Sequence, residues 1–92
     1  MERIETTILR NLIFNEEYSR KVLSFIKSDY FENRSEKVIF EEIEKFFHKY
    51  NSNVTIEALN IETESRTDLT ETEVKEVRDI NNSLIDYVVE NQ

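Results

Sequence analysis

His48 is the only histidine of the 92-residue sequence and the first candidate for acid–base or metal chemistry. It follows Glu44 by four residues, a spacing that puts both side chains on one side of a helix. A metal site needs more converging ligands than this pair, and the dinuclear iron motif of helical bundles has a three-residue step from Glu to His. The pair therefore predicts a solvated polar face. Cysteine is absent and no serine has a histidine near it in sequence, so no nucleophilic catalytic site is predicted.

Glycine and proline are also absent. Phosphate-binding loops depend on glycine, so we expect no ATP site in these residues. The sequence thus predicts no catalytic residue, no cofactor site and no metal site. Helix ends need another residue for left-handed backbone, and asparagine is the next choice. Asparagine occurs where turns are expected, at Asn15, Asn33, Asn51, Asn53 and Asn60.

Basic residues and aromatic rings are interleaved between residues 20 and 37, as they are in proteins that bind single-stranded nucleic acid. Acidic residues are interspersed among them, and the whole chain has a net charge of −8. Residues 51–92 hold three Lys or Arg against ten Asp or Glu, which gives −7, whereas residues 1–50 give −1. Phosphate binding draws its affinity from Lys and Arg, so we expect no strong DNA binding by this segment alone.

Apolar residues recur at three- and four-residue spacing through most of the chain, which predicts helices. The polar, charged and aromatic side chains named above are therefore expected to lie on helices or on the connections between them. The stretch 35–50 carries the largest rings on one face and predicts the central helix of a bundle. We expect a single all-α domain of about five helices, over residues 3–13, 16–27, 35–50, 55–60 and 70–90, with a mobile loop at 63–68. The predicted core comprises Leu12, Phe31, Ile39, Phe40, Ile43 and Phe47.

Capping signals define the predicted helix boundaries. Thr70 and Glu73 have the spacing of a capping box, and Thr55 has the position of an N-cap. The central helix begins at a cap that is either Asn33 or Ser35. Its outer face is expected to carry charged residues in solvent, with Glu41 and Lys45 forming a pair. These charged residues are Glu36, Glu41, Glu42, Glu44, Lys45 and Lys49.

Two further expectations concern aromatic and aliphatic side chains. Tyr30 and Phe31 come after the second helix and are expected to plug one end of the bundle. Near the end of the last helix, Ile85 and Val89 widen the apolar stripe beyond the width of one core contact, which suggests a second partner surface. The alternative explanation, which the sequence favours equally, is that these two residues pack under the first helix. The predicted self-association interface is Leu84, Ile85, Val88 and Val89.

Three short strings carry a resemblance that covers nearly all of the chain. They are LIF at 12–14, DYFE at 29–32 and IEALN at 56–60. In their order and spacing they resemble the N-terminal domain of DnaB-type replicative helicases, in the variant found in T-even phages. The sequence departs from the common bacterial pattern in lacking loop proline and glycine and in having Glu32 and Glu36 where an aromatic residue and a histidine are often found. These departures are typical of a phage branch.

The resemblance implies that residues 1–92 are the collar domain of a ring-shaped hexameric helicase, with the ATPase domain beyond residue 92. The parent protein would use ATP and Mg²⁺ to unwind DNA in the 5′ to 3′ direction, whereas the 92 residues alone would not be an enzyme. The collar would pair with copies of itself, as a dimer in isolation and a hexamer in the parent. It would dock primase, with a helicase loader as a further partner. The implied location is the cytoplasm of a phage-infected bacterial host, and the sequence has no long apolar run that predicts a membrane segment.

The acidity of the chain motivates a different hypothesis. A freestanding acidic helical regulator that binds a basic surface of a host protein would have the same bundle. The two hypotheses differ in the polypeptide expected beyond residue 92, since only the helicase continues into a G-x-x-x-x-G-K-[ST] loop.

Overall fold

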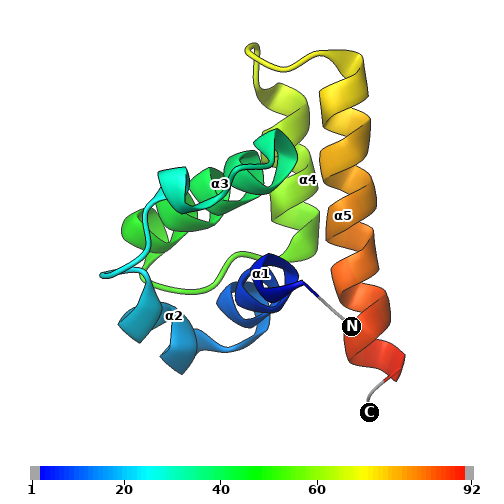
Figure 1. The fold of residues 1–92 in the computed structure, drawn as a ribbon. Coiled ribbons are helices and arrows are strands. Elements are labelled where there is room, and N and C mark those ends of the chain that lie inside the picture. Colours follow the sequence, from blue (N-terminus) through cyan, green and yellow to red (C-terminus); the bar gives the residue numbers. More distant parts are fainter. Residues whose placement is uncertain (1–2, 91–92) are drawn as a thin grey trace.

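The computed structural model describes the backbone of residues 3–90 and the side chains of residues 3–85. Over this range the chain forms five α-helices, one short 3₁₀-helix and no strand (Figure 1). The prediction of a small all-α bundle of about five helices is confirmed. The elements are α1 (Ile4–Phe14), α2 (Glu16–Val22), η1 (Ser28–Tyr30), α3 (Arg34–Tyr50), α4 (Ile56–Ser65) and α5 (Glu71–Glu90).

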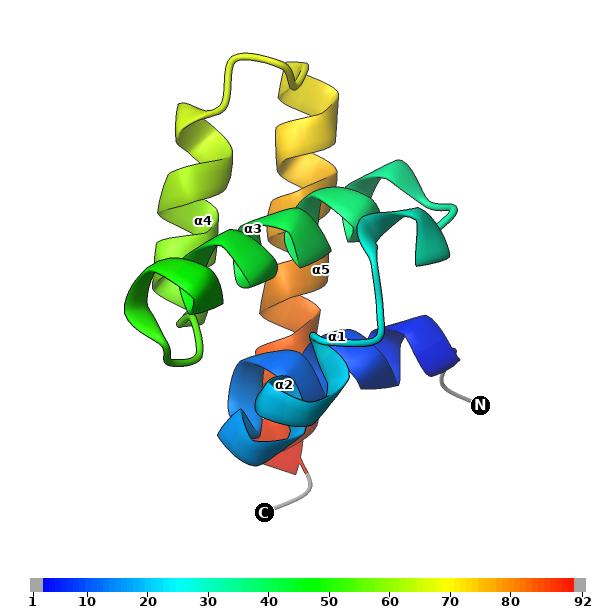
Figure 2. The same cartoon turned by 90° about the vertical axis from the view of Figure 1, so that its left-hand side faces the viewer.

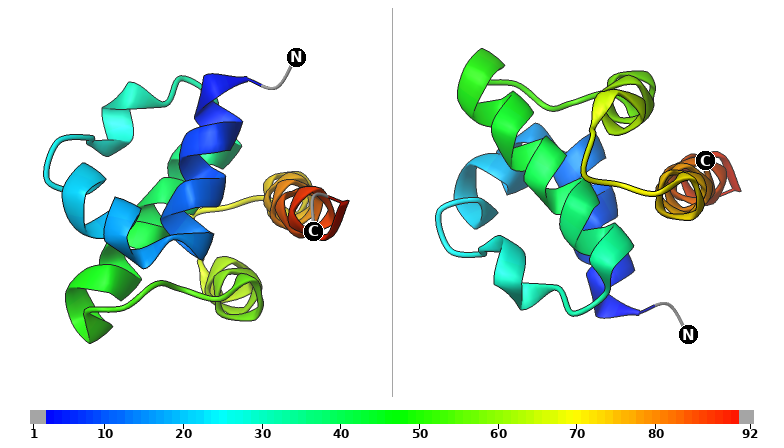
Figure 3. Two further views of the ribbon diagram at one scale, coloured as in Figure 1. Left: turned by 90° about the horizontal axis from the view of Figure 1, so that it is seen from below. Right: turned by 90° about the horizontal axis from the view of Figure 1, so that it is seen from above.

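The helices α4 and α5 run side by side in opposite directions and form a helical hairpin (Figures 1 and 2). The helix α3 crosses this hairpin, and α1 and α2 lie at the end of the hairpin where α4 begins (Figure 2). Seen along the hairpin, α1, α2 and α3 all lie to one side of it (Figure 3). The apolar core therefore lies between the hairpin and the layer that these three helices form.

Polar side chains cap the starts of α2, α3, α4 and α5. The side chains of Asn15, Asn33 and Thr55 each accept a hydrogen bond from a backbone N–H in the first turn of their helix. At α5 the Glu73 N–H donates to Thr70 Oγ1 over 3.1 Å, and the Thr70 N–H donates to Glu73 Oε1 over 2.9 Å. These bonds satisfy amides that have no partner inside a helix. The predicted capping box is confirmed, and the cap of α3 is Asn33.

The end of α3 shows how the chain makes a helix stop without glycine. Asn51 has φ 53° and ψ 36°, the left-handed conformation, and its N–H donates to the Phe47 carbonyl over 2.7 Å. Glycine usually fills this position because it has no Cβ, and asparagine is the residue that tolerates it next best. The expectation for asparagine in turns is confirmed at this residue.

Two aromatic rings occupy the centre of the core. Phe31 and Phe40 have no exposed surface, and their ring centroids lie 5.2 Å apart. Phe31 comes from the segment after η1 and is fully buried, whereas its neighbour Tyr30 is 46% exposed, so only one of the two rings expected to plug the end of the bundle enters the core. Five of the six predicted core residues are buried, namely Leu12, Phe31, Ile39, Phe40 and Ile43.

Phe47, the sixth predicted core residue, is only partly buried and packs at the edge of the core. The Arg20 guanidinium covers its ring from α2, at 5.6 Å from the ring centroid. One turn later Tyr50, which belongs to the same predicted stripe, is 55% exposed. The assignment of Phe47 to the core is corrected to a position at the edge of the core, because the Arg20 guanidinium rather than apolar side chains covers its ring.

The helix α2 ends at Val22, well before the predicted residue 27. The Ser24 hydroxyl donates to the Lys21 carbonyl over 2.8 Å, and the Phe25 N–H donates to the Val22 carbonyl, so the chain tightens into a turn. Serine competes with helical hydrogen bonds in this way. As a result Phe25, which falls within the predicted second helix, lies beyond the end of α2 and is 82% exposed.

The helix α4 is longer than predicted and extends to Ser65 through part of the expected mobile loop. Thr63 is buried, and its hydroxyl donates to the Leu59 carbonyl over 2.7 Å inside the helix. Asn60, expected at a turn, instead accepts a hydrogen bond of 3.0 Å from the Nδ2 of Asn81 on α5. Asn81 is fully buried and Asn60 is half-buried, so this hydrogen bond joins the two helices of the hairpin.

Candidate protein-interaction surfaces

The predicted self-association interface divides into three parts in the structure. Leu84 is fully buried in the core and cannot contact another protein, so its assignment to the interface is wrong. Its side chain belongs to the same apolar cluster as Leu9 and Leu12 of α1. Ile85, the next residue, is 36% exposed and lies beside the core. Val88 and Val89 lie outside the residues whose side chains are described.

Ile85 contributes to an apolar groove of about 400 Å³ between the end of α1, the start of α4 and α5. Phe14, which is 47% exposed, forms part of the same groove. We call this surface the Phe14 groove. Its lining residues are Ile13, Phe14, Asn53, Val54, Thr55, Ile56, Glu57 and Ile85.

Local hydrogen bonds explain why the Phe14 groove is open. The helix α1 ends at Phe14 because Asn15 adopts an extended conformation to cap α2, and the ring is left at the corner. The Asn53 side chain donates to the Ile13 carbonyl over 3.1 Å and ties the segment before α4 to this corner. Exposed rings beside aliphatic side chains are typical of protein-interaction sites.

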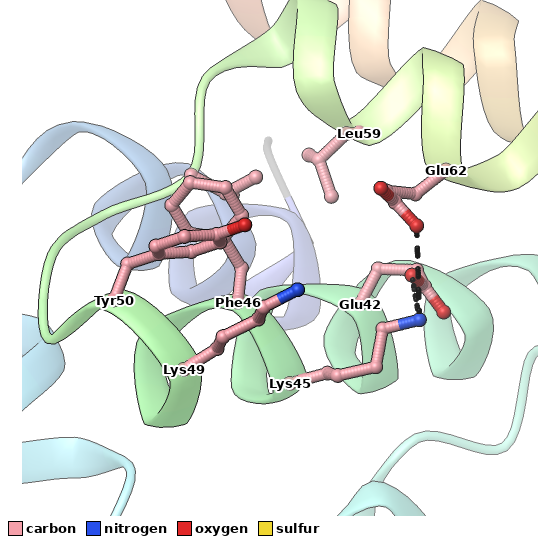
Figure 4. Close-up of a pocket in the computed structure, with 8 residues that line it drawn as sticks. Glu42, Lys45, Phe46, Lys49, Tyr50, Leu59 and Glu62 are labelled. Atoms are coloured by element: carbon pink, nitrogen blue, oxygen red, sulfur yellow. Dashed lines mark ion pairs between the residues drawn. The ribbon is translucent and has the colours of Figure 1, made fainter.

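A second hollow, which we call the α3–α4 cleft, has a volume of about 210 Å³ (Figure 4). The rings of Phe46 and Tyr50 lie at one end of it, with centroids 4.5 Å apart, and Leu59 points into it from α4. Charged side chains from both helices surround this apolar part. The full lining is Glu42, Lys45, Phe46, Lys49, Tyr50, Val54, Leu59 and Glu62.

The carboxylates of α3 are less exposed than predicted. Glu36 and Glu42 are 2% and 5% exposed, although periodicity placed both on the solvent face. Arg3 donates two hydrogen bonds to Glu36, over 2.8 and 3.1 Å. The Lys45 ammonium lies 2.9 Å from Glu42, so the predicted pair of Lys45 with Glu41 is replaced by one with Glu42. Sequence reasoning missed the burial of these carboxylates because Arg3, the partner of Glu36, and Arg66, a second partner of Glu42, are distant in the sequence.

Arg66, in the connection after α4, joins this connection to α3. Its guanidinium donates to Glu41 and Glu42 over 3.3 and 3.1 Å and to Asp68 over 2.6 Å. The hydrogen bonds from Arg66 hold the Asp68 pKa well below its ordinary value of 3.8. The backbone N–H of Thr70, followed by the charge of Arg34, lowers the pKa of Glu73. The connection expected to be mobile is thus anchored by ion pairs.

These lowered pKa values predict a specific acid response. Asp68 and Glu73 bind fewer protons in the folded state than in the unfolded state, so their contribution to stability is complete above their ordinary pKa values of 3.8 and 4.5. It is lost as the pH falls below these values. We expect urea denaturation between pH 6 and about 2.5 to show a decline in the free energy of unfolding that is shallower in Asp68→Asn. An identical decline in the variant would contradict the role of Asp68.

Other functional classes gain no support from the described part of the chain. No group of three or more His, Cys, Asp or Glu side chains is placed to hold a metal ion there. His48 is exposed at the end of α3. No helix within the described residues has the length and apolar character needed to cross a membrane.

The fold and these two hollows are those of a small all-α domain with surfaces suited to protein side chains. The chain is similar to the DnaB-like replicative helicase of Enterobacteria phage T4, with 37% identity over 79 residues. These residues make up 86% of this chain and 16% of the helicase, so the chain spans about a sixth of the length of this relative. The chain is therefore related to part of a replicative helicase. No family model and no solved structure matches it.

Proposed function

We propose that this chain is the N-terminal interaction domain of a phage-type replicative helicase. The similarity to the phage T4 helicase over 86% of the chain carries this proposal. The domain pairs with copies of itself in the hexameric ring and docks primase, with a helicase loader as a further partner. In this proposal the domain alone has no DNA-unwinding activity. ATP and Mg²⁺ belong to a further domain of the parent protein, because a chain without glycine has no phosphate-binding loop.

Self-association is assigned to the Phe14 groove. Phe14 and Ile85 are large apolar side chains with exposed fractions of 47% and 36%, and they meet at one surface. Burial of such a surface between two copies would remove apolar area from water, which is the main driving force of protein association. The same substitution can be compared at an apolar residue outside the groove, since Ile61 on α4 is 65% exposed.

We expect Ile85→Asp to raise the dissociation constant of self-association at least about tenfold, equivalent to about 1.4 kcal/mol, because it brings a charge into an apolar contact. Helix content measured by circular dichroism should not change, since Ile85 is outside the core. Sedimentation equilibrium at several concentrations measures the effect. The control is Ile61→Asp, which should leave the dissociation constant unchanged.

Two results would contradict the proposed function. One is a wild-type domain that stays monomeric at all concentrations and has no affinity for the cognate primase or loader. The other is an open reading frame without a G-x-x-x-x-G-K-[ST] loop after residue 92. That second result would favour the acidic regulator, which the charge of −7 over residues 51–92 also suits.

A further inference from the structure

The α3–α4 cleft has the size of a pocket for one side chain. Its volume is about 210 Å³. Pockets for small molecules of drug size are larger, roughly 300–1,000 Å³. Aromatic and aliphatic groups from Phe46, Tyr50 and Leu59 face this space (Figure 4). A single large apolar side chain from another polypeptide would fill it, as the anchor residues of protein interfaces do.

The two lysines of the cleft differ in their partners. Lys45 is neutralised within the domain, since its ammonium lies 2.9 Å from Glu42 and 3.8 Å from Glu62. The Lys49 ammonium lies 5.2 Å from the centroid of the Tyr50 ring, and no carboxylate among the side chains of residues 3–85 forms an ion pair with it. Lys49 is therefore a cation at the mouth of an apolar pocket that remains available for an anion.

The surroundings also limit how much negative charge the occupant can carry. Glu42 and Glu62 form part of the cleft wall, and the whole chain has a charge of −8. A nucleic acid strand would bring several phosphates close to these carboxylates, which is unfavourable. One carboxylate beside an apolar side chain suits the single available lysine.

We infer that the α3–α4 cleft binds a partner polypeptide through one large apolar residue that has an Asp or Glu next to it. The apolar side chain packs against the Phe46 and Tyr50 rings at the mouth of the cleft, above the fully buried Leu59, and the neighbouring carboxylate pairs with Lys49. This inference rests on the proposed function as a protein-interaction domain, and it adds a second contact surface, which shares only Val54 with the Phe14 groove, together with the chemistry of the partner.

Short blocked peptides test the inference with ¹⁵N-labelled wild-type domain. The probe is acetyl-Ala-Phe-Asp-Ala-amide, and the controls are the Asn analogue of its Asp and the Ala analogue of its Phe. We expect saturable amide shifts around Tyr50, Val54 and Leu59, with a dissociation constant on the order of 1 mM. The Asn peptide should bind about two- to fivefold more weakly, the effect of a part-exposed ion pair, and the Ala peptide should give no saturable shift.

The variant Lys49→Met tests whether Lys49 forms the ion pair with the carboxylate of the peptide. Lys49→Met keeps the length of the side chain and removes its charge, so it should bind the Asp peptide about two- to fivefold more weakly and no longer distinguish it from the Asn peptide. Lys75→Met, an exposed lysine on α5, is the matched control and should behave as wild type.

Four results would overturn the inference. They are the absence of saturable shifts up to about 10 mM peptide, equal binding of the Ala peptide, discrimination between Asp and Asn that survives in Lys49→Met, and the same shifts produced by a short oligothymidylate at lower concentration. Sedimentation of the same samples measures self-association separately. If the peptides fail to bind as expected but the domain still self-associates, the inference about the cleft is wrong and the proposed function still stands.

Discussion

Truncation of Phe40 to alanine should lower the free energy of unfolding by about 3–5 kcal/mol, the range found for large aromatic residues in cores. Phe40 has no exposed surface and packs against the Phe31 ring at 5.2 Å between centroids. Its removal leaves a cavity that helices from both layers cannot close without breaking other contacts. Small domains are typically stable by only about 5–15 kcal/mol, so this change alone would remove a large share of the free energy of unfolding. Urea denaturation followed by circular dichroism measures the effect.

Phe25→Ala is the control for this prediction, because it deletes the same atoms from a ring that is 82% exposed. We expect a change within about 0.5 kcal/mol, as for other surface substitutions. Equal losses in the two variants would mean that Phe25 packs in the folded protein and that the end of α2 is placed wrongly.

Replacement of Arg66 by methionine should cost about 1–3 kcal/mol, the cost of leaving a buried polar group without one of its partners. The side chain of Arg66 is 18% exposed and that of Glu42 is 5% exposed, and the two are 3.1 Å apart. Glu42 would keep Lys45 at 2.9 Å, which limits the loss. Methionine retains the apolar length of the side chain, so the measurement reports on the charge. Thermal and urea denaturation at neutral pH both measure it.

Arg78→Met serves as the matched control for Arg66. Arg78 pairs with Glu64, but the two side chains are 47% and 49% exposed. Exposed ion pairs contribute about 1 kcal/mol or less. A loss in Arg78→Met equal to that in Arg66→Met would contradict the view that the Arg66 network stabilises the fold through a buried carboxylate.

The features that could be predicted from the sequence are local ones. A cap and its helix are separated by three residues, so the capping box of Thr70 and Glu73 is readable directly. The ring-bearing stripe of α3 is likewise a property of a single segment. It placed Phe40 and Ile43 correctly in the interior, and they are 0% and 1% exposed. Fold class could be predicted from these patterns.

The features that could not be predicted depend on partners far away in the sequence. Glu36 is buried because Arg3, 33 residues earlier, donates to it. Glu42 is buried because Arg66 reaches it from the segment after α4. Periodicity gives the angle of a residue around its helix, but it does not show how many neighbours surround that helix. The same lack of information explains why Leu84 was grouped with Ile85, although one is buried and the other is partly exposed.

The hydrogen bond between the buried Asn81 amide and the half-buried Asn60 amide sets the alignment of the hairpin. A shift of α5 along α4 by one turn would move Asn81 away from Asn60 and leave the buried Asn81 amide without this 3.0 Å hydrogen bond. Sliding between the two helices is therefore penalised, and α4 and α5 are expected to keep one register along their length.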